Sequence, residues 1–389
     1  MGPEARDWED WMTRRRILVC LDSLAAGGAE RQTVQLVRGL NRERFKVQVV
    51  CLHGPRMHQS RHFVGDLQAD GFVVRELDRC WNRSELIPSL FAIRRCIQDF
   101  QPDLVHSVSH HCNHLTRFVR LLAGHRFRLL TAIRTDYNTR QLRNERLEQW
   151  LSTAIVCNSP SMEVKLRESA GIGAKRLSYI PNGLDVKRFS ENPDPGLRSR
   201  LAPGIRRVGV MLARITEQKS PDLLAKAVGE LRRRGQLPED VRLWIVGEQE
   251  SAEVQMRLEK VIQQHDLKNC IQQFPPTQQP EAYLHAADFS ILASLWEGTP
   301  NSVLESLAAG KPALVSKGAN ACGLIQPGRE GWEVRTGDTE DLADRLREIL
   351  QLPDPTIAAM KEPCRQKARE FDLPTMVCRY ESLYEDLLR

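Results

Sequence analysis

Short apolar runs alternate with amphipathic segments along the whole chain. Runs of this kind, bounded by Gly, Pro or Asp, are typical of buried parallel strands, and the segments between them have helical spacing. The alternation predicts βαβ units and therefore an α/β fold. The expected strands are 16–21, 45–52, 71–76, 103–108, 129–133, 154–157 and 177–180 in the first half, and 208–213, 241–246, 271–274, 289–293, 313–316 and 331–334 in the second.

The chain is expected to form two domains, because its 389 residues exceed the size at which one core stops growing, about 250–300 residues. The stretch 189–205 is rich in Pro, Asn and Asp, so we place a linker there between a domain at 14–188 and a domain at 206–371. The last segment, 372–389, is predicted to be an amphipathic helix whose apolar face needs a partner. Its apolar residues recur at spacings of three and four: Val377, Tyr380, Leu383, Tyr384 and Leu387.

Composition is that of a globular protein without a membrane-spanning segment. Hydrophobic residues make up 41% and charged residues 27%, and no run approaches the ~18 uninterrupted apolar residues of a spanning helix. Ten cysteines stand singly, without a Cys-x-x-Cys pair, and no secretory signal is recognisable. We therefore expect reduced core thiols and a cytoplasmic protein.

Charge is unevenly distributed. The net charge is +6, but residues 1–190 carry +10 and residues 191–389 carry −4, so the two halves face different partners. Four arginines surround the apolar segment Phe-Val-Arg-Leu-Leu of the first half: Arg117, Arg120, Arg126 and Arg128. They suggest peripheral docking at the inner face of an anionic membrane, or binding of an acidic acceptor, while a solvated basic face is the alternative. We expect no nucleic-acid partner.

A glycine-containing turn follows the first expected strand. Gly27 and Gly28 lead from it into a helix-like segment, and such a turn lets backbone amides approach an anion or a sugar oxygen. The pair therefore predicts donor contacts, with a tight turn that binds nothing as the alternative. The full Gly-x-Gly-x-x-Gly spacing is absent, which argues against a dinucleotide site.

Two cations follow the first strand of the second half. Arg214 and Lys219 precede Ser220, an expected N-cap, and Pro221, an expected first helical residue. Ligands of open α/β sheets gather at the carboxyl ends of strands, and an Arg with a Lys beside helix amides suits a pyrophosphate. A solvated loop is the alternative reading.

The most informative passage is 294–312, Ser-Leu-Trp-Glu-Gly-Thr-Pro-Asn-Ser-Val-Leu-Glu-Ser-Leu-Ala-Ala-Gly-Lys-Pro. Here Thr299 is an expected cap and Pro300 an expected first helical residue, so the helix would direct its first amides at donor phosphate or sugar hydroxyls. Those amides belong to Asn301, Ser302 and Val303. Two glutamates on a solvated helix are the alternative, but Glu297 lies ahead of the expected cap.

This passage resembles the E-x7-E signature of GT-B glycosyltransferases, in particular the large retaining family 4 of the group 1 type. Glu297 and Glu305 are its two glutamates, and Gly-Thr-Pro and Ala-Ala-Gly-Lys-Pro match as well. Further matches follow in the family's order over nearly the whole chain: Gly27-Gly28-Ala29-Glu30, Pro181-Asn182-Gly183, Arg214 with Lys219, and the C-terminal helix.

The resemblance implies a GT-B fold, with two Rossmann-like domains that face an interdomain cleft and a C-terminal helix that crosses back to the first domain. The implied activity is retaining, metal-independent hexosyl transfer from a UDP- or GDP-sugar to a glycan, lipid-linked or small-molecule acceptor, in polysaccharide or glycolipid biosynthesis and without a cofactor. Glu297 would then lie at the transferred sugar, and Glu305 would bind the ribose hydroxyls. Arg214 and Lys219 would stabilise the leaving diphosphate.

The sequence departs from the family's pattern at two places. Many relatives carry a histidine near the reacting sugar where this chain has Arg134, which stays charged and can stabilise the leaving phosphate or orient a hydroxyl. Asp136 could hold Arg134 in place or bind the acceptor, and a plain Arg134–Asp136 surface pair is the alternative. A glutamate that is often found in the later Gly-rich loop is replaced around Cys322-Gly323, so donor contacts from that loop are in doubt.

Acceptor contacts are further expected from His106, His110 and Asn182 in the first half. His106, His110 and His111 share no ligand spacing and are joined by no carboxylate, so we predict no metal site, and packing is the alternative role. Two rival functions remain open: a GT-B-like nucleotide-sugar epimerase or hydrolase, and a non-catalytic sugar-nucleotide-binding scaffold. An epimerase or hydrolase would consume donor without acceptor, and a scaffold would bind donor without turnover.

Overall fold

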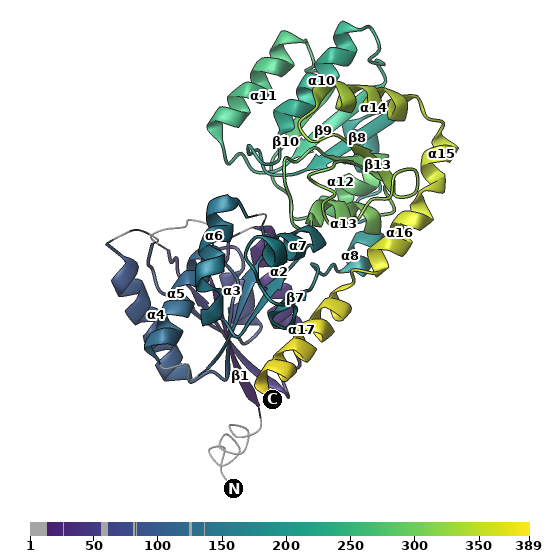
Figure 1. Cartoon of the computed structure of the whole chain (residues 1–389). Helices are drawn as coiled ribbons and strands as arrows, with labels where there is room; N and C mark the ends of the chain where they lie inside the picture. Colours follow the sequence, from purple (N-terminus) through teal and green to yellow (C-terminus); the bar gives the residue numbers. More distant parts are fainter. Residues whose placement is uncertain are drawn as a thin grey trace. The chain divides into compact units, whose positions relative to one another are not determined.

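The computed structural model describes residues 14–25, 27–55, 61–80, 82, 84–123, 127–135 and 137–389. The chain forms two compact units. The first unit consists of the chain up to Gly183 together with the C-terminal segment Leu373–Arg389. The second unit is Leu184–Asp372. Each unit contains one parallel β-sheet with helices packed on it (Figure 1), which confirms the predicted α/β class.

The sheet of the first unit has the strand order β3-β2-β1-β4-β5-β6-β7. Its neighbouring strands all pair in parallel. Each strand expected in this half is present, with ends that differ from the prediction by at most two residues. The strands are β1 (Arg15–Leu21), β2 (Phe45–Cys51), β3 (Val73–Glu76), β4 (Leu104–Ser107), β5 (Arg128–Ile133), β6 (Ala154–Cys157) and β7 (Leu177–Tyr179).

Alternate residues of these strands face opposite sides of the first sheet, and each side has its own helices. Ile17 and Val19 of β1 belong to a core shared with α2 (Gly28–Gly39), α3 (Val64–Ala69) and α17 (Leu373–Leu388). Leu18 and Cys20 face a second core with α4 (Leu86–Phe100) and α5 (His110–Leu122). Farther along this second face, α6 (Thr139–Glu148) and α7 (Pro160–Glu168) cover β6. Short 3₁₀ turns lie at η1 (Gln149–Leu151) and η2 (Ala174–Arg176).

The C-terminal helix α17 has the bounds that its apolar spacing predicts, and it packs on the first unit, as the resemblance implied. Its buried side chains are Met376, Val377, Tyr380 and Tyr384. The Tyr384 hydroxyl lies 2.7 Å from Nδ1 of His106, which is fully buried on β4. A segment remote in sequence thus completes the core of the first unit.

The sheet of the second unit has the order β10-β9-β8-β11-β12-β13, and each predicted strand of this half is present. Its strands are β8 (Arg207–Leu212), β9 (Val241–Val246), β10 (Ile271–Phe274), β11 (Phe289–Leu292), β12 (Ala313–Ser316) and β13 (Gly331–Val334). Its helices are α8 (Val186–Ser190), α9 (Leu197–Leu201), α10 (Pro221–Arg233), α11 (Ala252–Gln264), α12 (Pro280–Ala286), α13 (Asn301–Ala308), α14 (Thr339–Gln351), α15 (Asp354–Ala359) and α16 (Lys361–Arg369).

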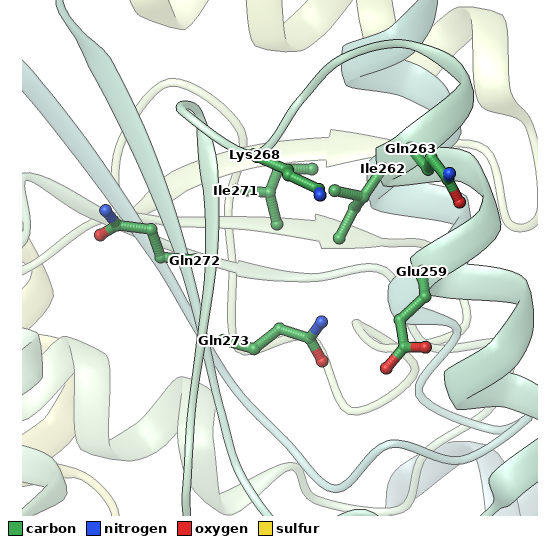
Figure 2. Close-up of a pocket in the computed structure, with 7 residues that line it drawn as sticks. All are labelled: Glu259, Ile262, Gln263, Lys268, Ile271, Gln272 and Gln273. Atoms are coloured by element: carbon green, nitrogen blue, oxygen red, sulfur yellow. The ribbon is translucent and has the colours of Figure 1, made fainter.

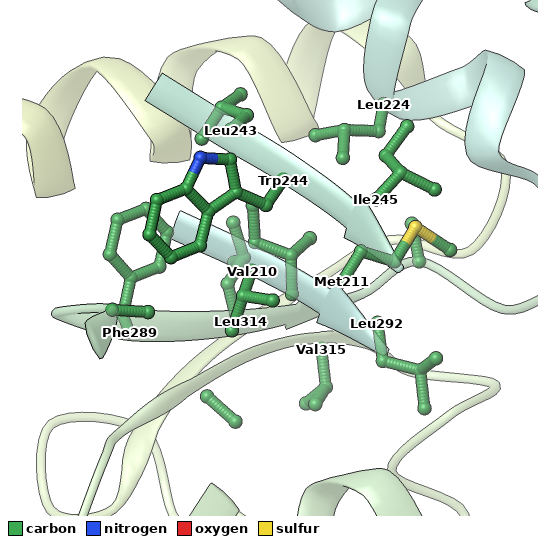
Figure 3. Packing of buried hydrophobic residues seen from close by; sticks show 14 of the residues in the cluster. Val210, Met211, Leu224, Leu243, Trp244, Ile245, Phe289, Leu292, Leu314 and Val315 are labelled. Carbon is green, nitrogen blue, oxygen red and sulfur yellow. The ribbon is translucent and has the colours of Figure 1, made fainter. Parts of the chain in front are cut away.

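One continuous core holds this second unit together. Trp244 of β9 is fully buried among strand residues such as Val210, Phe289 and Leu314 (Figure 3). Its indole Nε1 donates a hydrogen bond to Oε1 of Gln272 at 3.1 Å, so its polar atom has a partner on the neighbouring edge strand β10.

The predicted linker, 189–205, lies inside the second unit. Phe189, at the end of α8, is buried in the core of that unit, and Arg198 of α9 forms an ion pair with Asp288 at 3.0 Å. The structure instead divides the chain after Gly183 and after Asp372. The Pro-, Asn- and Asp-rich composition reflects turns between two short helices that pack on this core.

Candidate functional site

The strand order of the second sheet reverses between β8 and β11. From β8 the chain continues to β9 and β10 on one side, and β11, β12 and β13 follow on the other. The loops that leave β8 and β11 therefore diverge at one edge, and such switch points are where open α/β sheets bind ligands. Lys219 lies beyond the end of β8, and Glu297 lies beyond the end of β11.

Lys219 and Glu297 form an ion pair across this switch point. Nζ of Lys219 contacts Oε1 of Glu297, and the two side chains are only 16% and 8% exposed. Gln218 holds the same loops together through two hydrogen bonds. Its side-chain Nε2 donates to the Trp296 backbone carbonyl at 2.8 Å, and its backbone carbonyl accepts from the Leu295 amide at 2.8 Å. The structure thus brings two expected site residues into contact in a mostly buried place, where charges interact more strongly than in water.

Two glycines allow the neighbouring loops to close on this edge. A Cβ at Gly318, after β12, would lie 2.3 Å from the Leu295 carbonyl oxygen, and the Gly318 carbonyl accepts from the Glu297 amide at 3.1 Å. A Cβ at Gly247, after β9, would lie 2.0 Å from the Ala213 carbonyl oxygen. The four loops after β8, β9, β11 and β12 therefore meet at the carboxyl edge because two of them lack a side chain at the contact.

Arg214 lies at the same edge but pairs with a different carboxylate. Its Nη1 contacts Glu250, in the loop after β9, and the two side chains are 44% and 50% exposed. Sequence reasoning missed Glu250 and Gln218. Each follows a strand of the second sheet by only a few residues, and that position was the available signal.

Helix α13 begins one residue later than predicted. Pro300 occupies the N-cap position, Asn301 is the first helical residue, and Thr299 precedes the cap. The Val303 amide donates to the Pro300 carbonyl at 3.2 Å, so it is used within the turn. The Asn301 and Ser302 amides lie at the positive end of the helix, and Glu305 is buried at 5% exposure one turn farther on.

The start of α10 also differs from the prediction in its capping chemistry. Pro221 is the first helical residue, as expected, and Ser220 occupies the N-cap position. Ser220 has a left-handed φ of 46°, and its hydroxyl donates to the Glu217 carbonyl at 2.7 Å instead of accepting from the helix. Ser220 therefore occupies the expected N-cap position, but its side chain does not cap the helix.

In the first unit the strand order reverses between β1 and β4. Gly27 is the N-cap of α2 and Gly28 its first residue, which agrees with the predicted turn. Asp22, just after β1, accepts a hydrogen bond from Ser109 Oγ at 2.6 Å and lies 3.1 Å from Nδ1 of His111. Burial raises the pKa of Asp22, but the contacts with His111 and Ser109 outweigh it, so the net pKa is lowered.

The histidines expected to contact an acceptor are mostly enclosed. His106 is fully buried beneath α17, so the packing alternative applies and the acceptor assignment is wrong for this residue. Burial first, and Arg134 second, lower its pKa to about 3. His110 lies 3.3 Å from the Tyr137 hydroxyl and 3.2 Å from His114, and burial lowers its pKa to about 4. Within the described residues no group of three or more His, Cys, Asp or Glu side chains could hold a metal.

Arg134 lies at the end of β5, where its Nη2 donates to Asn182 Oδ1 at 2.8 Å. Asn158, at the end of β6, donates to the Arg134 carbonyl at 3.3 Å. Burial raises the pKa of Tyr380 on α17, and Arg134 opposes that effect through charge and a hydrogen bond. Three neighbouring strand ends therefore supply one polar cluster, whereas Asp136, its expected partner, lies outside the described residues.

Two of the four arginines in the predicted basic stretch are buried on α5 and do not form a surface patch. Arg117 is 1% exposed, and its Nη1 donates to Glu145 Oε2 at 3.0 Å. Arg120 is also buried and donates to the carbonyls of Phe127 and Leu151. Arg128 is exposed, and Arg126 lies outside the described residues.

A further hollow of the second unit, about 560 Å³, lies between α11 and the edge strand β10. Glu259 extends toward it from α11 and Gln273 from β10 (Figure 2). None of the expected site residues lines it, so it is separate from the switch-point edge.

Two general expectations concern the whole chain. All ten cysteines, each in the described part of the sequence, are free, and eight of them are buried, as predicted for core thiols. In the part of the chain that the structure describes, every helix is too short or too polar to cross a membrane.

Comparison with known proteins agrees with this architecture. Residues 26–188 match the model of Glycosyltransferase Family 4, and residues 198–371 match the model of Glycosyl transferases group 1. The UDP-Gal:alpha-D-GlcNAc-diphosphoundecaprenol alpha-1,3-galactosyltransferase of Escherichia coli is 24% identical over 93% of this chain and 94% of that protein.

Solved structures share the fold over nearly the full length. Anabaena HepE, in its complex with UDP and glucose, superposes with a TM-score of 0.82 at 18% identity, over 96% of this chain and 100% of that one. A glycosyltransferase of Rickettsia africae gives a TM-score of 0.80 at 19% identity, over 97% and 99%. The expected GT-B architecture is thereby confirmed. Because the two family models follow one another along most of a chain with this fold, the protein belongs to the family 4, group 1 glycosyltransferases.

Proposed function

We propose that the chain transfers a hexose from a UDP- or GDP-sugar to a lipid-linked or other glycan acceptor, with retention of anomeric configuration and without a metal. The Lys219–Glu297 ion pair at the β8/β11 switch point is the observation that carries this proposal. UDP is the favoured nucleotide, because the Escherichia coli relative is named for UDP-Gal and the Anabaena structure holds UDP.

In this proposal the donor diphosphate binds at the carboxyl edge of the second sheet. Lys219 and Arg214 supply the positive charge, and the Asn301 and Ser302 amides supply hydrogen bonds at the start of α13. Both cations contact carboxylates, Glu297 and Glu250, so a diphosphate would compete with those carboxylates for them. The positive charges of Lys219 and Arg214 at this edge support the proposed binding of the donor diphosphate.

Glu297 is proposed to bind hydroxyls of the transferred sugar, and Glu305 the ribose hydroxyls. A carboxylate accepts two hydrogen bonds, which suits paired hydroxyls. Both glutamates are mostly buried, at 8% and 5% exposure, so neither lies on a solvated helix face. Their burial supports a binding role over a solvated helix.

The chemical step is proposed to need charge stabilisation more than proton transfer by a side chain. The bond between the anomeric carbon and the diphosphate oxygen breaks, and the acceptor oxygen bonds to that carbon on the same face. The departing diphosphate takes the acceptor's proton, and Lys219 and Arg214 stabilise its developing charge. Two cations at this place make a metal unnecessary in the proposal.

The first unit is proposed to bind the acceptor at its own carboxyl edge. His110, Asn182 and Arg134 lie beyond strand ends there, and Arg134 and Asn182 are already hydrogen-bonded to one another. The Escherichia coli relative is named for an acceptor linked to diphosphoundecaprenol, which supports a lipid-linked acceptor in polysaccharide or glycolipid assembly.

The test begins with titration calorimetry of UDP and GDP against the full chain. A donor whose nucleotide binds is then incubated with candidate lipid-linked acceptors in the presence of EDTA, and the product's anomeric configuration is read by NMR. Acceptor-dependent transfer with retention is the expected result. Donor consumption without acceptor would instead indicate an epimerase or hydrolase, and binding without turnover a scaffold.

A further inference from the structure

The two cations of the proposed donor site hold their carboxylates in different surroundings. Lys219 and Glu297 are only 16% and 8% exposed, whereas Arg214 and Glu250 are 44% and 50% exposed. A pair that is half in water contributes little to stability, because water screens its charges and solvates both groups when they separate. The Arg214–Glu250 pair can therefore open without leaving a buried charge unpaired, and the Lys219–Glu297 pair cannot.

The loops that carry Arg214 and Glu250 are joined through their backbones. The Ile215 amide donates to the Glu248 carbonyl at 2.8 Å, and the Ser251 amide donates to the Ile215 carbonyl at 3.1 Å. These hydrogen bonds lie next to Arg214 and on both sides of Glu250 in the sequence, so they keep the two side chains within reach of one another. An exchange of partners by Arg214 therefore requires side-chain rotation and no movement of either loop.

Glu250 and Arg214 differ in what remains for them when the pair opens. Glu250 directly precedes Ser251, the N-cap of α11, whose hydroxyl accepts from the Val254 amide at 3.3 Å. A carboxylate beside the positive end of a helix is stabilised there, and the half-exposed Glu250 is solvated as well. Among the described residues, Glu250 is the one carboxylate within ion-pair distance of Arg214. Arg214 therefore depends on an incoming anion or on Glu250, whereas Glu250 does not depend on Arg214.

We propose that Glu250 is a positioning residue that shares Arg214 with the nucleoside diphosphate. Arg214 binds the diphosphate of the donor and of the product, and it returns to Glu250 as the product leaves. This role rests on the proposed function, because it requires a nucleoside diphosphate at this edge. It adds a part in product release, since a carboxylate held beside the guanidinium captures it whenever a phosphate contact opens and so shortens the time that the product stays bound.

Substitution of Glu250 by glutamine removes the competing charge and keeps the size of the side chain. Glu250→Gln should therefore lower the Kd of UDP about threefold or more, mainly through slower release, because related complexes differ chiefly in their dissociation rates. Titration calorimetry gives the Kd, and displacement of a fluorescent UDP analogue by excess UDP gives the release rate. GDP replaces UDP if it is the nucleotide that the wild type binds. Thermal melting confirms that each variant is folded.

Two further comparisons separate this role from a general effect of charge. The control Glu253→Gln removes the same charge from the first turn of α11, where Glu253 pairs with Arg257. This control should change the Kd less than about 1.5-fold, because an exposed charge acts weakly at a distance. In an Arg214→Gln background, Glu250→Gln should also change the Kd less than about 1.5-fold, because Glu250 acts through Arg214.

Failure of this role and failure of the proposed function give different results. Unchanged Kd and release in Glu250→Gln, with a wild type that binds UDP, would overturn the role of Glu250 and leave donor binding in place. Equal tightening in Glu253→Gln would overturn it as well, since net charge alone would explain the effect, and so would equal tightening in the Arg214→Gln background. A wild type that binds neither UDP nor GDP would overturn the proposed function together with this role.

Discussion

At the scale of single residues, the candidate donor site rests on a cation and a carboxylate that already contact one another. Lys219 and Glu297 come from loops almost eighty positions apart in sequence, and Gln218 fixes the loops that carry them. Removal of one partner leaves the other charge in a mostly buried place, which costs more than the loss of a surface pair. Variants at this edge therefore report on both binding and local stability.

Lys219→Ala and Arg214→Ala should each lower kcat, by roughly 10²-fold for loss of one group that stabilises the leaving diphosphate. Because both act on the same charge, the double variant should lose less than the product of the single effects. Steady-state kinetics measures this, with Lys226→Ala, a surface cation paired with Asp222, as the control. Wild-type kcat in either single variant would refute the assignment.

Glu305→Ala should weaken UDP binding by about 1–3 kcal/mol, as expected when a hydrogen-bonding charged partner is removed. Calorimetry with free UDP is the direct measurement. Glu259→Ala serves as the matched control, because Glu259 lines the separate hollow beside β10. Loss of UDP binding in the control alone would move the nucleotide site to that hollow.

At the scale of elements, the sequence predicts the strands well and the details around them less well. Strands of a parallel sheet are buried on both faces, so several are continuous apolar runs such as Ala154–Cys157, with a turn residue after the end. The residue pattern does not predict how a helix is capped. Ser220 has a left-handed backbone at the start of α10, and Pro300 rather than Thr299 occupies the N-cap position of α13. Residue type suggests a cap, but backbone angles decide which atom bonds.

Sequence-based prediction was limited in the same way at the candidate site. Lys219 and Glu297 could be assigned from motif and strand position, but their contact depends on the strand order of the second sheet, which sequence spacing does not determine. Arg117 was expected at the surface, yet Glu145, 28 positions later, pairs with it inside the unit. Long-range partners of charged side chains were the main source of error.

Docking of α17 should make the first unit sensitive to acid. Burial lowers the pKa of His106 to about 3, from an ordinary value near 6.5, so the unfolded chain binds a proton more readily than the folded one between these values. The stability that the neutral imidazole supplies is fully present above about pH 6.5 and is lost as the pH falls toward 3. Urea unfolding across this range should show the decline.

The variant His106→Phe combined with Tyr384→Phe removes the titrating ring without leaving the Tyr384 hydroxyl unpartnered. Its stability should depend less steeply on pH between 6.5 and 3 than that of the wild type, whatever its absolute value. An unchanged slope would show that other groups, such as His110, govern the acid response.

At the scale of the whole molecule, the two units differ in how the chain builds them. The second is one continuous stretch, Leu184–Asp372, whereas the first needs a helix from beyond it. Ligand binding at the β8/β11 edge should stabilise only the unit that binds. The two units can therefore be distinguished by their response to UDP.

Truncation after Asp372 should unfold the first unit and leave UDP binding in place. It removes four buried side chains, each worth about 1.5–3 kcal/mol, a sum comparable to the total stability of about 5–15 kcal/mol of a typical domain. Calorimetric scanning with and without UDP separates the two transitions. The control, Arg379→Ala with Ser382→Ala on the exposed side of α17, should melt like the wild type. Two intact transitions in the truncated chain would contradict this role of the helix.

Because α17 follows the second unit in the sequence, it also determines when the first unit can complete its fold during synthesis. After Gly183 has been made, the ribosome must add roughly 190 residues before Leu373 follows, which takes about 10–40 s at about 5–20 residues per second. During that interval the residues of the first sheet that pack on α17 are uncovered, while the second unit receives all of its own residues. We therefore expect the first unit to be the last to mature, and its open apolar face to be a substrate for chaperones on the nascent chain.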